Sequence, residues 1–256
     1  MIVTAQHSYG SIGGGHLEFE ACKTARGLLA SDSTNSIGRI VSHNALQRHY
    51  ALGPSLGQCC GGTVNLTFAF LFQDSLDTWP NDPPLFRLAL FGAGHVGRAM
   101  MQALTPIHCE VWWVDERQDQ FDLKHQTPVL TQQICTDLVV AEIASLPSDT
   151  MVIICTHSHA LDLELCESAL KREDLPWIGL IGSATKKARF LHRLQHRGRS
   201  QQQLSRLICP IGLPGILGKE PEVIAASVLA QLLQMSSTAS GLHTPSHRTM
   251  SDTLDV

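Results

Sequence analysis

The sequence lacks the features that mark several classes of protein. No apolar run reaches the roughly 18 residues that a membrane-spanning helix needs. The N-terminus, MIVTAQHSYG, has no basic patch followed by an apolar stretch, so it does not resemble a secretory signal. Charged residues make up only 16% of the 256 residues and hydrophobic residues 43%, which excludes a disordered chain. We expect a globular, cytoplasmic protein of one or two domains.

Cysteines are present, but not at the spacing of a zinc ribbon or a redox motif. The eight cysteines include no CxxC pair, and only Cys59 and Cys60 are close in sequence. Adjacent cysteines bridge each other only with strain. We therefore expect free thiols in a reducing compartment, most of them small core residues.

Acidic residues are missing from one long stretch. The net charge of -4 disfavours nucleic-acid binding by the surface as a whole, yet no Asp or Glu occurs from Leu175 to Lys219. Within it, Ser183 is placed to cap a helix that begins with Ala184, and Lys186 and Lys187 fall in its first turn. These two lysines are candidate anion ligands, and we expect the basic residues beyond Arg193 to form a solvated helix face.

Composition divides the chain into four parts. Residues 1–72 are glycine-rich, residues 73–85 have the proline and aspartate content of a linker, and residues 236–256 read as a disordered tail. Between them, residues 86–235 alternate apolar runs with helix-like sequence. This alternation predicts an α/β fold, with a C-terminal Rossmann-like parallel sheet covered by helices on both faces. A smaller glycine-rich N-terminal α+β domain precedes it.

The predicted elements follow from these runs. Strands are expected at 63–72, 87–92, 110–115, 151–156 and 177–183, and helices at 16–30, from 93 to Pro106, from Asp162, at 184–197 and at 221–233.

The sequence GAGHVG fits the dinucleotide fingerprint. It consists of Gly92, Gly94 and Gly97 with His95 inside the turn, and Asp115 ends the next predicted strand about 20 residues on. Gly92 permits the turn, Gly94 lets a pyrophosphate approach the backbone, and Gly97 allows close packing. The alternative is a Rossmann turn kept for packing alone, since one fold serves many functions.

The sequence THSH follows the strand predicted at 151–156. His157 and His159 could hold a metal, but no nearby carboxylate or cysteine completes a ligand set. A polar turn that leads into a helix explains them equally well.

Two glycine-rich segments of the N-terminal domain are further candidates. Gln58, Cys59, Cys60 and Gly61 lie between glycines in a turn open enough for a ligand, where backbone amides can stabilise a thiolate that binds a soft metal or carries sulfur. The alternative is a pair of small buried residues. The triplet Gly13, Gly14 and Gly15 (13–15) is an anion nest or a sharp turn.

Five segments together resemble one family. GSIGGGHLE, LGPSLGQCCGG, LFGAGHVGRA, GLIGSATKKARF and CPIGLPGILGKEPEVIAASVLAQLL occur in this order from about Gly10 to Leu233. The set is similar to the xanthine dehydrogenase accessory proteins of the XdhC/CoxI type, and LGPSLGQCCGG is its most specific segment.

The resemblance implies a molybdenum cofactor chaperone with a small N-terminal domain and a Rossmann domain. Such a protein binds molybdopterin, supports its sulfuration with a cysteine desulfurase, and delivers it to apo xanthine dehydrogenase or a related molybdenum hydroxylase. Cys59 or Cys60 would then contact the cofactor molybdenum. Family members carry a further N-terminal segment before the position of Met1, so the resemblance implies either a misassigned start or a truncated first domain. A homodimer is compatible with it.

Two other functions remain open from the residues. An NAD(P)-dependent oxidoreductase would use the turn from Gly92 to Asp115, whose carboxylate would favour NAD over NADP. A metal- or sulfur-handling protein would act through Cys59 and Cys60 without the pterin. The leading interpretation is a binding and delivery protein rather than an enzyme, with no nucleic-acid or membrane partner.

Overall fold

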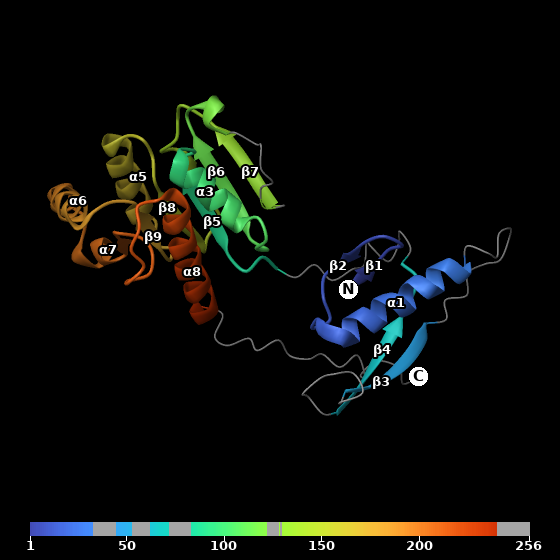
Figure 1. Cartoon of the computed structure of the whole chain (residues 1–256). Coiled ribbons are helices and arrows are strands. Elements are labelled where there is room, and N and C mark those ends of the chain that lie inside the picture. Colours follow the sequence, from blue (N-terminus) through green and yellow to red (C-terminus); the bar gives the residue numbers. More distant parts are fainter. Residues whose placement is uncertain (33–44, 53–61, 72–82, 122–127, 129, 240–256) are drawn as a thin grey trace, which may run out of the picture. The chain divides into compact units, whose positions relative to one another are not determined.

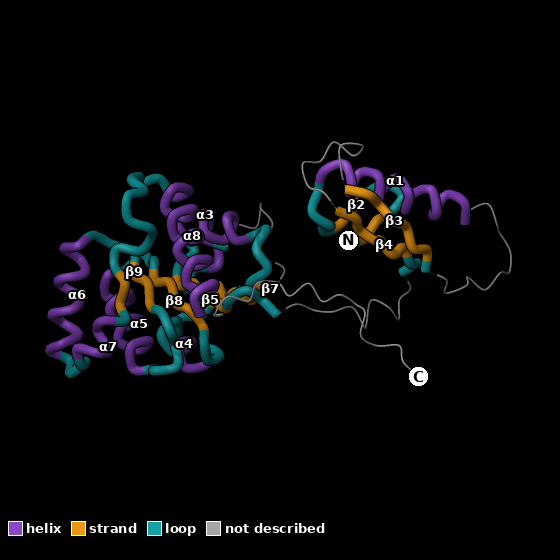
Figure 2. Tube along the Cα trace, turned by 90° about the horizontal axis from the view of Figure 1, so that it is seen from below, coloured by secondary structure: helices purple, strands orange, loops and turns teal. Residues whose placement is uncertain are grey.

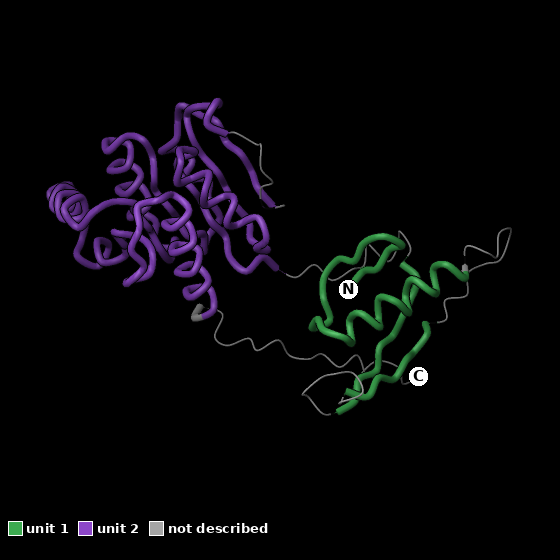
Figure 3. The backbone as a smooth tube through the Cα atoms, viewed as in Figure 1, with its two compact units in different colours: residues 1–81 green, residues 82–256 purple. Residues whose placement is uncertain are grey.

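The chain forms two compact units, residues 1–81 and residues 82–256 (Figure 3). The structure is a computed structural model that describes residues 1–32, 45–52, 62–71, 83–121, 128 and 130–239. None of the helices in these ranges is both long and apolar enough to cross a bilayer.

The first unit places one helix beside short antiparallel strands. Its elements are β1 (Ile2–Val3), β2 (Ser8–Tyr9), α1 (Gly15–Asp32), β3 (Leu46–Leu52) and β4 (Gly62–Phe68), with β1 paired to β2 and β3 to β4. On α1, Leu17, Ala21 and Cys22 are buried, at the spacing of one helix face. The Thr24 hydroxyl lies 3.2 Å from that of Tyr50, which links α1 to β3.

The second unit is built on a six-stranded parallel sheet. Its strands are β5 (Arg87–Phe91), β6 (Glu110–Asp115), β7 (Leu130–Cys135), β8 (Thr150–Ile154), β9 (Ile178–Leu180) and β10 (Leu207–Ile208). They lie in the order β10-β9-β8-β5-β6-β7, so β5, the first strand of the unit, is central. After β6 and β7 have been added on one side of β5, the chain crosses back and β8 pairs with the other side of β5. This is the Rossmann order, and it confirms the predicted fold class.

Helices cover both faces of this sheet (Figures 1 and 2). They are α3 (His95–Leu104), α4 (Glu142–Ser145), α5 (His159–Lys171), α6 (Ala184–His196), α7 (Gln201–Ser205) and α8 (Pro221–Ala239), with a short 3-10 turn η2 (Gln118–Gln120) after β6. Residues of α3 and α8 share one core cluster, while residues of α4 to α7 share the other. The strands between them are buried on both faces, which explains their continuous apolar sequence.

Several elements differ from the sequence prediction. The edge strands β7 and β10 were not predicted, because LTQQIC is polar and half exposed and β10 has only two residues. Helix α5 begins at His159 rather than at Asp162. Helix α8 continues past Leu233 to Ala239, so the first residues of the predicted tail are helical.

Candidate functional site

The glycine turn lies at the carboxyl end of β5, where open α/β sheets bind ligands. Gly92 has φ of +122°, and a Cβ there would lie 2.4 Å from the carbonyl oxygen of Cys155. A Cβ on Gly97 would lie 2.0 Å from the carbonyl oxygen of Gly92, which also accepts a hydrogen bond from the Trp113 indole at 3.1 Å. Both glycines are therefore required by packing within the protein.

Gly94 differs from its neighbours. A Cβ there would meet no heavy atom within 4 Å, so the space in front of this backbone is open. Gly94 is also the N-cap of α3 and provides no side-chain cap, and the exposed His95 follows it. By contrast, the hydroxyls of Ser158 and Ser183 cap α5 and α6. Of the starts of α3, α5 and α6, that of α3 has no side-chain cap, so none of its first amides is taken by one and they are available to an anion.

Asp115 ends β6 and its carboxylate is fully engaged. Its Oδ1 accepts hydrogen bonds from the backbone amide and the Nε of Arg117, both at 2.9 Å. Its Oδ2 accepts from the Ala93 amide at 2.7 Å and from Nη2 of Arg117 at 2.9 Å. Burial alone would raise the pKa of Asp115, but the hydrogen bonds from Arg117 and Ala93 outweigh it and hold the pKa below its usual value. Asp115 therefore fixes the turn as an ionised carboxylate.

A narrow crevice, without room for a water molecule, lies between parts of this edge. The side chains and backbone that line it come from Gly92, Val114, Asp115, Glu116, Val139, Thr156, His157 and Leu161. The Nε2 of His157 lies 3.4 Å from a carboxylate oxygen of Glu116. His159 is the exposed first residue of α5. Within the described ranges, no three His, Cys, Asp or Glu residues are grouped so as to hold a metal.

Lys186 is held inside the protein. Its ammonium lies 2.6 Å from Oδ2 of Asp162 and donates to the carbonyl of Ile181 at 2.9 Å, and the pair is almost completely buried. The other oxygen of Asp162 accepts from the amide and hydroxyl of Thr156. Lys186 thus joins α6 to α5 and to the end of β9, and its charge is already paired. Lys187, half exposed, forms no ion pair with any described residue and is the better anion candidate of the two.

The glycine triplet 13–15 of the first unit forms a nest around a carboxylate of the same chain. All three glycines have positive φ. Carboxylate oxygens bind in such a nest. Here Oε2 of Glu18 accepts hydrogen bonds from the Ser11 hydroxyl at 2.5 Å and from the backbone amides of Ile12 and Gly14, both at 3.0 Å. An external anion would have to displace Glu18.

The hydrogen bonds of this nest make the stability of the first unit depend on pH. The Ser11 hydroxyl and the Ile12 and Gly14 amides lower the pKa of Glu18. A depressed pKa stabilises the folded state above the unfolded value of about 4.3 and ceases to do so as pH falls through the folded value. Glu18→Gln should therefore reduce thermal stability of the first unit at pH 7, with a smaller difference from the wild type at acidic pH. Glu20→Gln, which removes only an exposed 3.7 Å pair with Lys23, is the control. Equal losses in the two variants would contradict the assignment.

Six of the eight cysteines lie in the part of the chain that the structure describes. Gln58, Cys59, Cys60 and Gly61 lie outside the described residues. Of the six other cysteines, only Cys135 is exposed. Burial raises the pKa of Cys109 to about 11 and that of Cys155 to about 12, so both are neutral thiols at physiological pH.

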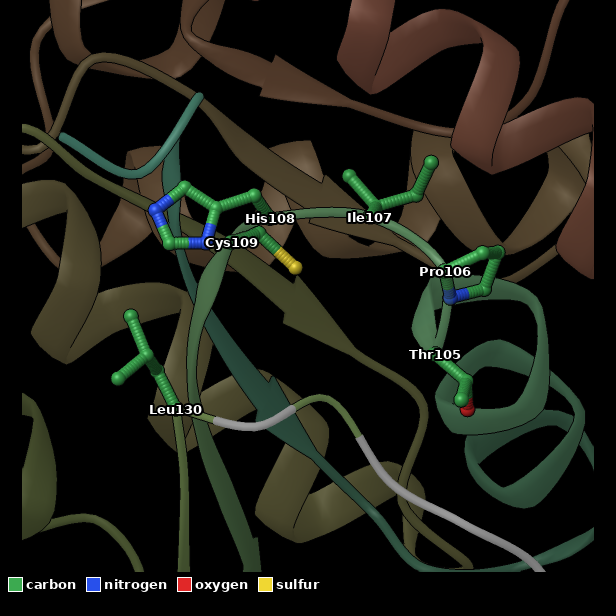
Figure 4. A pocket seen from close by; sticks show the side chains of 6 residues that line it. All are labelled: Thr105, Pro106, Ile107, His108, Cys109 and Leu130. Carbon is green, nitrogen blue, oxygen red and sulfur yellow. The ribbon is translucent and has the colours of Figure 1, made fainter. Parts of the chain in front are cut away.

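A separate pocket of about 190 Å³ lies at the opposite, amino edge of the sheet (Figure 4). Thr105, Pro106, Ile107, His108, Cys109 and Leu130 line it. None of the residues predicted from the sequence as functional is among them.

Three residues that matter to these sites were missed by the sequence analysis. Glu18, Arg117 and Asp162 each complete a charged arrangement whose other half had been identified. The signal for Arg117 was its position two residues after the strand-terminal Asp115. Asp162 and Lys186 are 24 residues apart, and no local pattern connects them.

Comparison with known proteins agrees with this architecture. A family model described as the XdhC Rossmann domain matches residues 88–232. The uncharacterized protein YqeB of Escherichia coli (strain K12) is 28% identical over 251 residues, which are 96% of this chain and 42% of that protein, so the chain spans less than half of its relative's length. A crystal structure of a xanthine dehydrogenase from Bacillus halodurans is 20% identical, with a TM-score of 0.64 over 93% of this chain and 85% of that one, which is a likeness of fold. Since the family model covers more than half of the sequence, this chain belongs to the XdhC family.

Proposed function

We propose that this protein binds molybdenum cofactor and delivers it to apo xanthine dehydrogenase or a related molybdenum hydroxylase, with a cysteine desulfurase as its partner in sulfuration. Membership of the XdhC family supports an accessory role. The structural observation that carries the proposal is the uncapped start of α3 behind the open backbone of Gly94. The chain is then a carrier and not a turnover enzyme.

The residues at this edge fit the anionic part of such a cofactor. Molybdopterin ends in a phosphate, and the first amides of α3 are the donors that a phosphate takes at a helix start. The open space at Gly94 leaves room for it without movement of the backbone. At α6, the Ser183 hydroxyl already occupies one of the amides and Lys186 is paired, so we place the phosphate at α3.

The remaining roles concern protection and transfer. Bound cofactor supplies the molybdenum–dithiolene group that the client enzyme uses for redox chemistry. The part of this protein is to hold the phosphate and keep the group intact until transfer. Cys59 and Cys60 stay predicted contacts of the molybdenum. Gln58, Gly61 and the triplet 13–15 stay predicted cofactor-binding residues.

The oxidoreductase alternative has less support from the geometry. Hydride transfer needs a nucleotide site and an acid or base beside the nicotinamide. His157 is the candidate acid or base, but it contacts Glu116, and the Asp115 carboxylate that would accept the ribose is engaged by Arg117. NAD(P) binding is therefore the second candidate.

The test compares two glycine variants purified from cells that make the cofactor. Gly94→Ala places a methyl group where the phosphate would approach and should lower the retained pterin and molybdenum about ten-fold, equivalent to about 1.4 kcal/mol of binding. Gly27→Ala, on α1, adds a methyl group that also meets no heavy atom within 4 Å and should leave retention unchanged. Wild-type protein without pterin, or equal retention by a folded Gly94→Ala protein, would contradict the proposal.

A further inference from the structure

The Asp115–Arg117 pair occupies the position at which a Rossmann domain normally binds the ribose of a nucleotide. In dinucleotide-binding proteins, the acidic residue at the end of the second strand accepts the ribose hydroxyl groups of the adenosine. Asp115 ends β6, the second strand of this sheet, and lies beside the glycine turn through its bond to the Ala93 amide. It has the right place for that contact.

Its oxygens have no capacity left for a ribose. An ionised carboxylate offers about four acceptor positions. Four donors fill them here, three from Arg117 and one from Ala93, at 2.7 to 2.9 Å. Asp115 is also only 5% exposed, so a ribose could not reach it from another side.

We propose that Arg117 excludes adenine dinucleotides from this turn by saturating Asp115. The inference goes beyond the proposed function, because it concerns the ligands that the site rejects. A ribose diol could bind only if the guanidinium left both carboxylate oxygens, which would break a two-pronged, charge-assisted pair. The phosphate donors of α3 remain available throughout, because Arg117 takes no part in them.

This arrangement separates two features that usually act together. The glycine turn and the start of α3 still accept a phosphate, whereas the ribose acceptor is closed. A phosphate-bearing ligand without an adenosine ribose at this position is therefore preferred over NAD or NADP. Arg117 is thus a specificity-determining residue, with its effect exerted through Asp115.

The experiment is a calorimetric titration of the full chain with NADH and with NADPH. Wild-type protein should show no saturation below about 1 mM, which corresponds to binding weaker than about -4.1 kcal/mol. Arg117→Ala should bind NADH at least ten-fold more tightly than the wild type, since Asp115 regains two acceptor positions. NADPH should gain less, because a free carboxylate repels the 2′-phosphate.

Two further variants keep the result interpretable. Arg117→Gln retains a polar side chain but cannot engage both oxygens, so it should also gain NADH binding if the alanine variant proves unstable. Arg87→Ala removes an arginine from an ion pair with Glu110 at the amino ends of β5 and β6 and should gain nothing. Micromolar NADH binding by the wild type would overturn the inference, as would no gain in folded Arg117 variants. Because no molybdenum cofactor is present in the assay, either failure leaves the proposed function untouched.

Discussion

Replacing Lys186 by methionine is expected to lower the free energy of unfolding by about 3–5 kcal/mol, the usual cost of leaving one partner of a buried ion pair without its counter-charge. The side chain of Asp162 is 1% exposed and that of Lys186 14%, so water cannot take over the lost contact. Lys186 also donates to Ile181 and lies 5.4 Å above the Phe190 ring, and methionine preserves only the packing of its stem. Urea denaturation measures the loss.

A double variant shows whether the lost stability comes from the unpaired charge of Asp162 or from a loss of packing. Asp162→Asn with Lys186→Met removes both charges, while the amide oxygen of the asparagine can still accept from Thr156. It should recover at least about 1 kcal/mol relative to Lys186→Met alone, because residues in contact are not additive. If the double variant is less stable than the single one, the charge on Asp162 is not the cause.

Gly97→Ala is expected to destabilise the second unit by about 3 kcal/mol or more, at or beyond the upper end of the range for overpacked positions. The added methyl group would lie 2.0 Å from the carbonyl oxygen of Gly92, which belongs to the backbone and is fixed by the Trp113 indole. The turn and the first turn of α3 would have to separate. The fall in thermal midpoint, compared with that of the wild type, reports the effect.

Gly94→Ala is the matched control for this prediction, since the same methyl group three residues earlier meets no atom within 4 Å. Its cost should stay below about 1 kcal/mol, the amount expected for alanine at a helix N-cap. A stable Gly97→Ala protein, or an unstable Gly94→Ala protein, would show that the two glycines have been assigned the wrong roles.

The sequence predicted the fold of the second unit because its central strands are buried on both faces. The runs at β5, β6 and β8 are continuous and apolar, and turn or helix signals follow each of them. The edge strands were not predicted because an edge strand is partly exposed to solvent. In β7, Gln132 and Gln133 are exposed, so the strand has no apolar period. In this sheet, burial on both faces produces the continuous apolar runs, and the half-exposed edge strand lacks them.

The candidate site was predictable in position but not in its bonding. Local spacing located Gly94, Asp115, Ser183 and Lys186 at one edge of the sheet, because parallel strands end there together. It could not reveal which charges were already satisfied within the protein. Asp115 and Lys186 look like free ligands in the sequence, and only the folded chain brings Arg117 and Asp162 to them.

The strand order also determines when the carboxyl edge of the sheet is complete during protein synthesis. The glycine turn is walled by Cys155, which lies 63 residues after Gly92, because β8 pairs with β5 across the middle of the sheet. A nascent chain that has released β5, β6 and β7 from the ribosome still lacks that wall, and its central strand has one unpaired edge. The glycine turn is therefore complete only after β8 has emerged and paired with β5, whereas residues 1–81 leave the ribosome before the second unit.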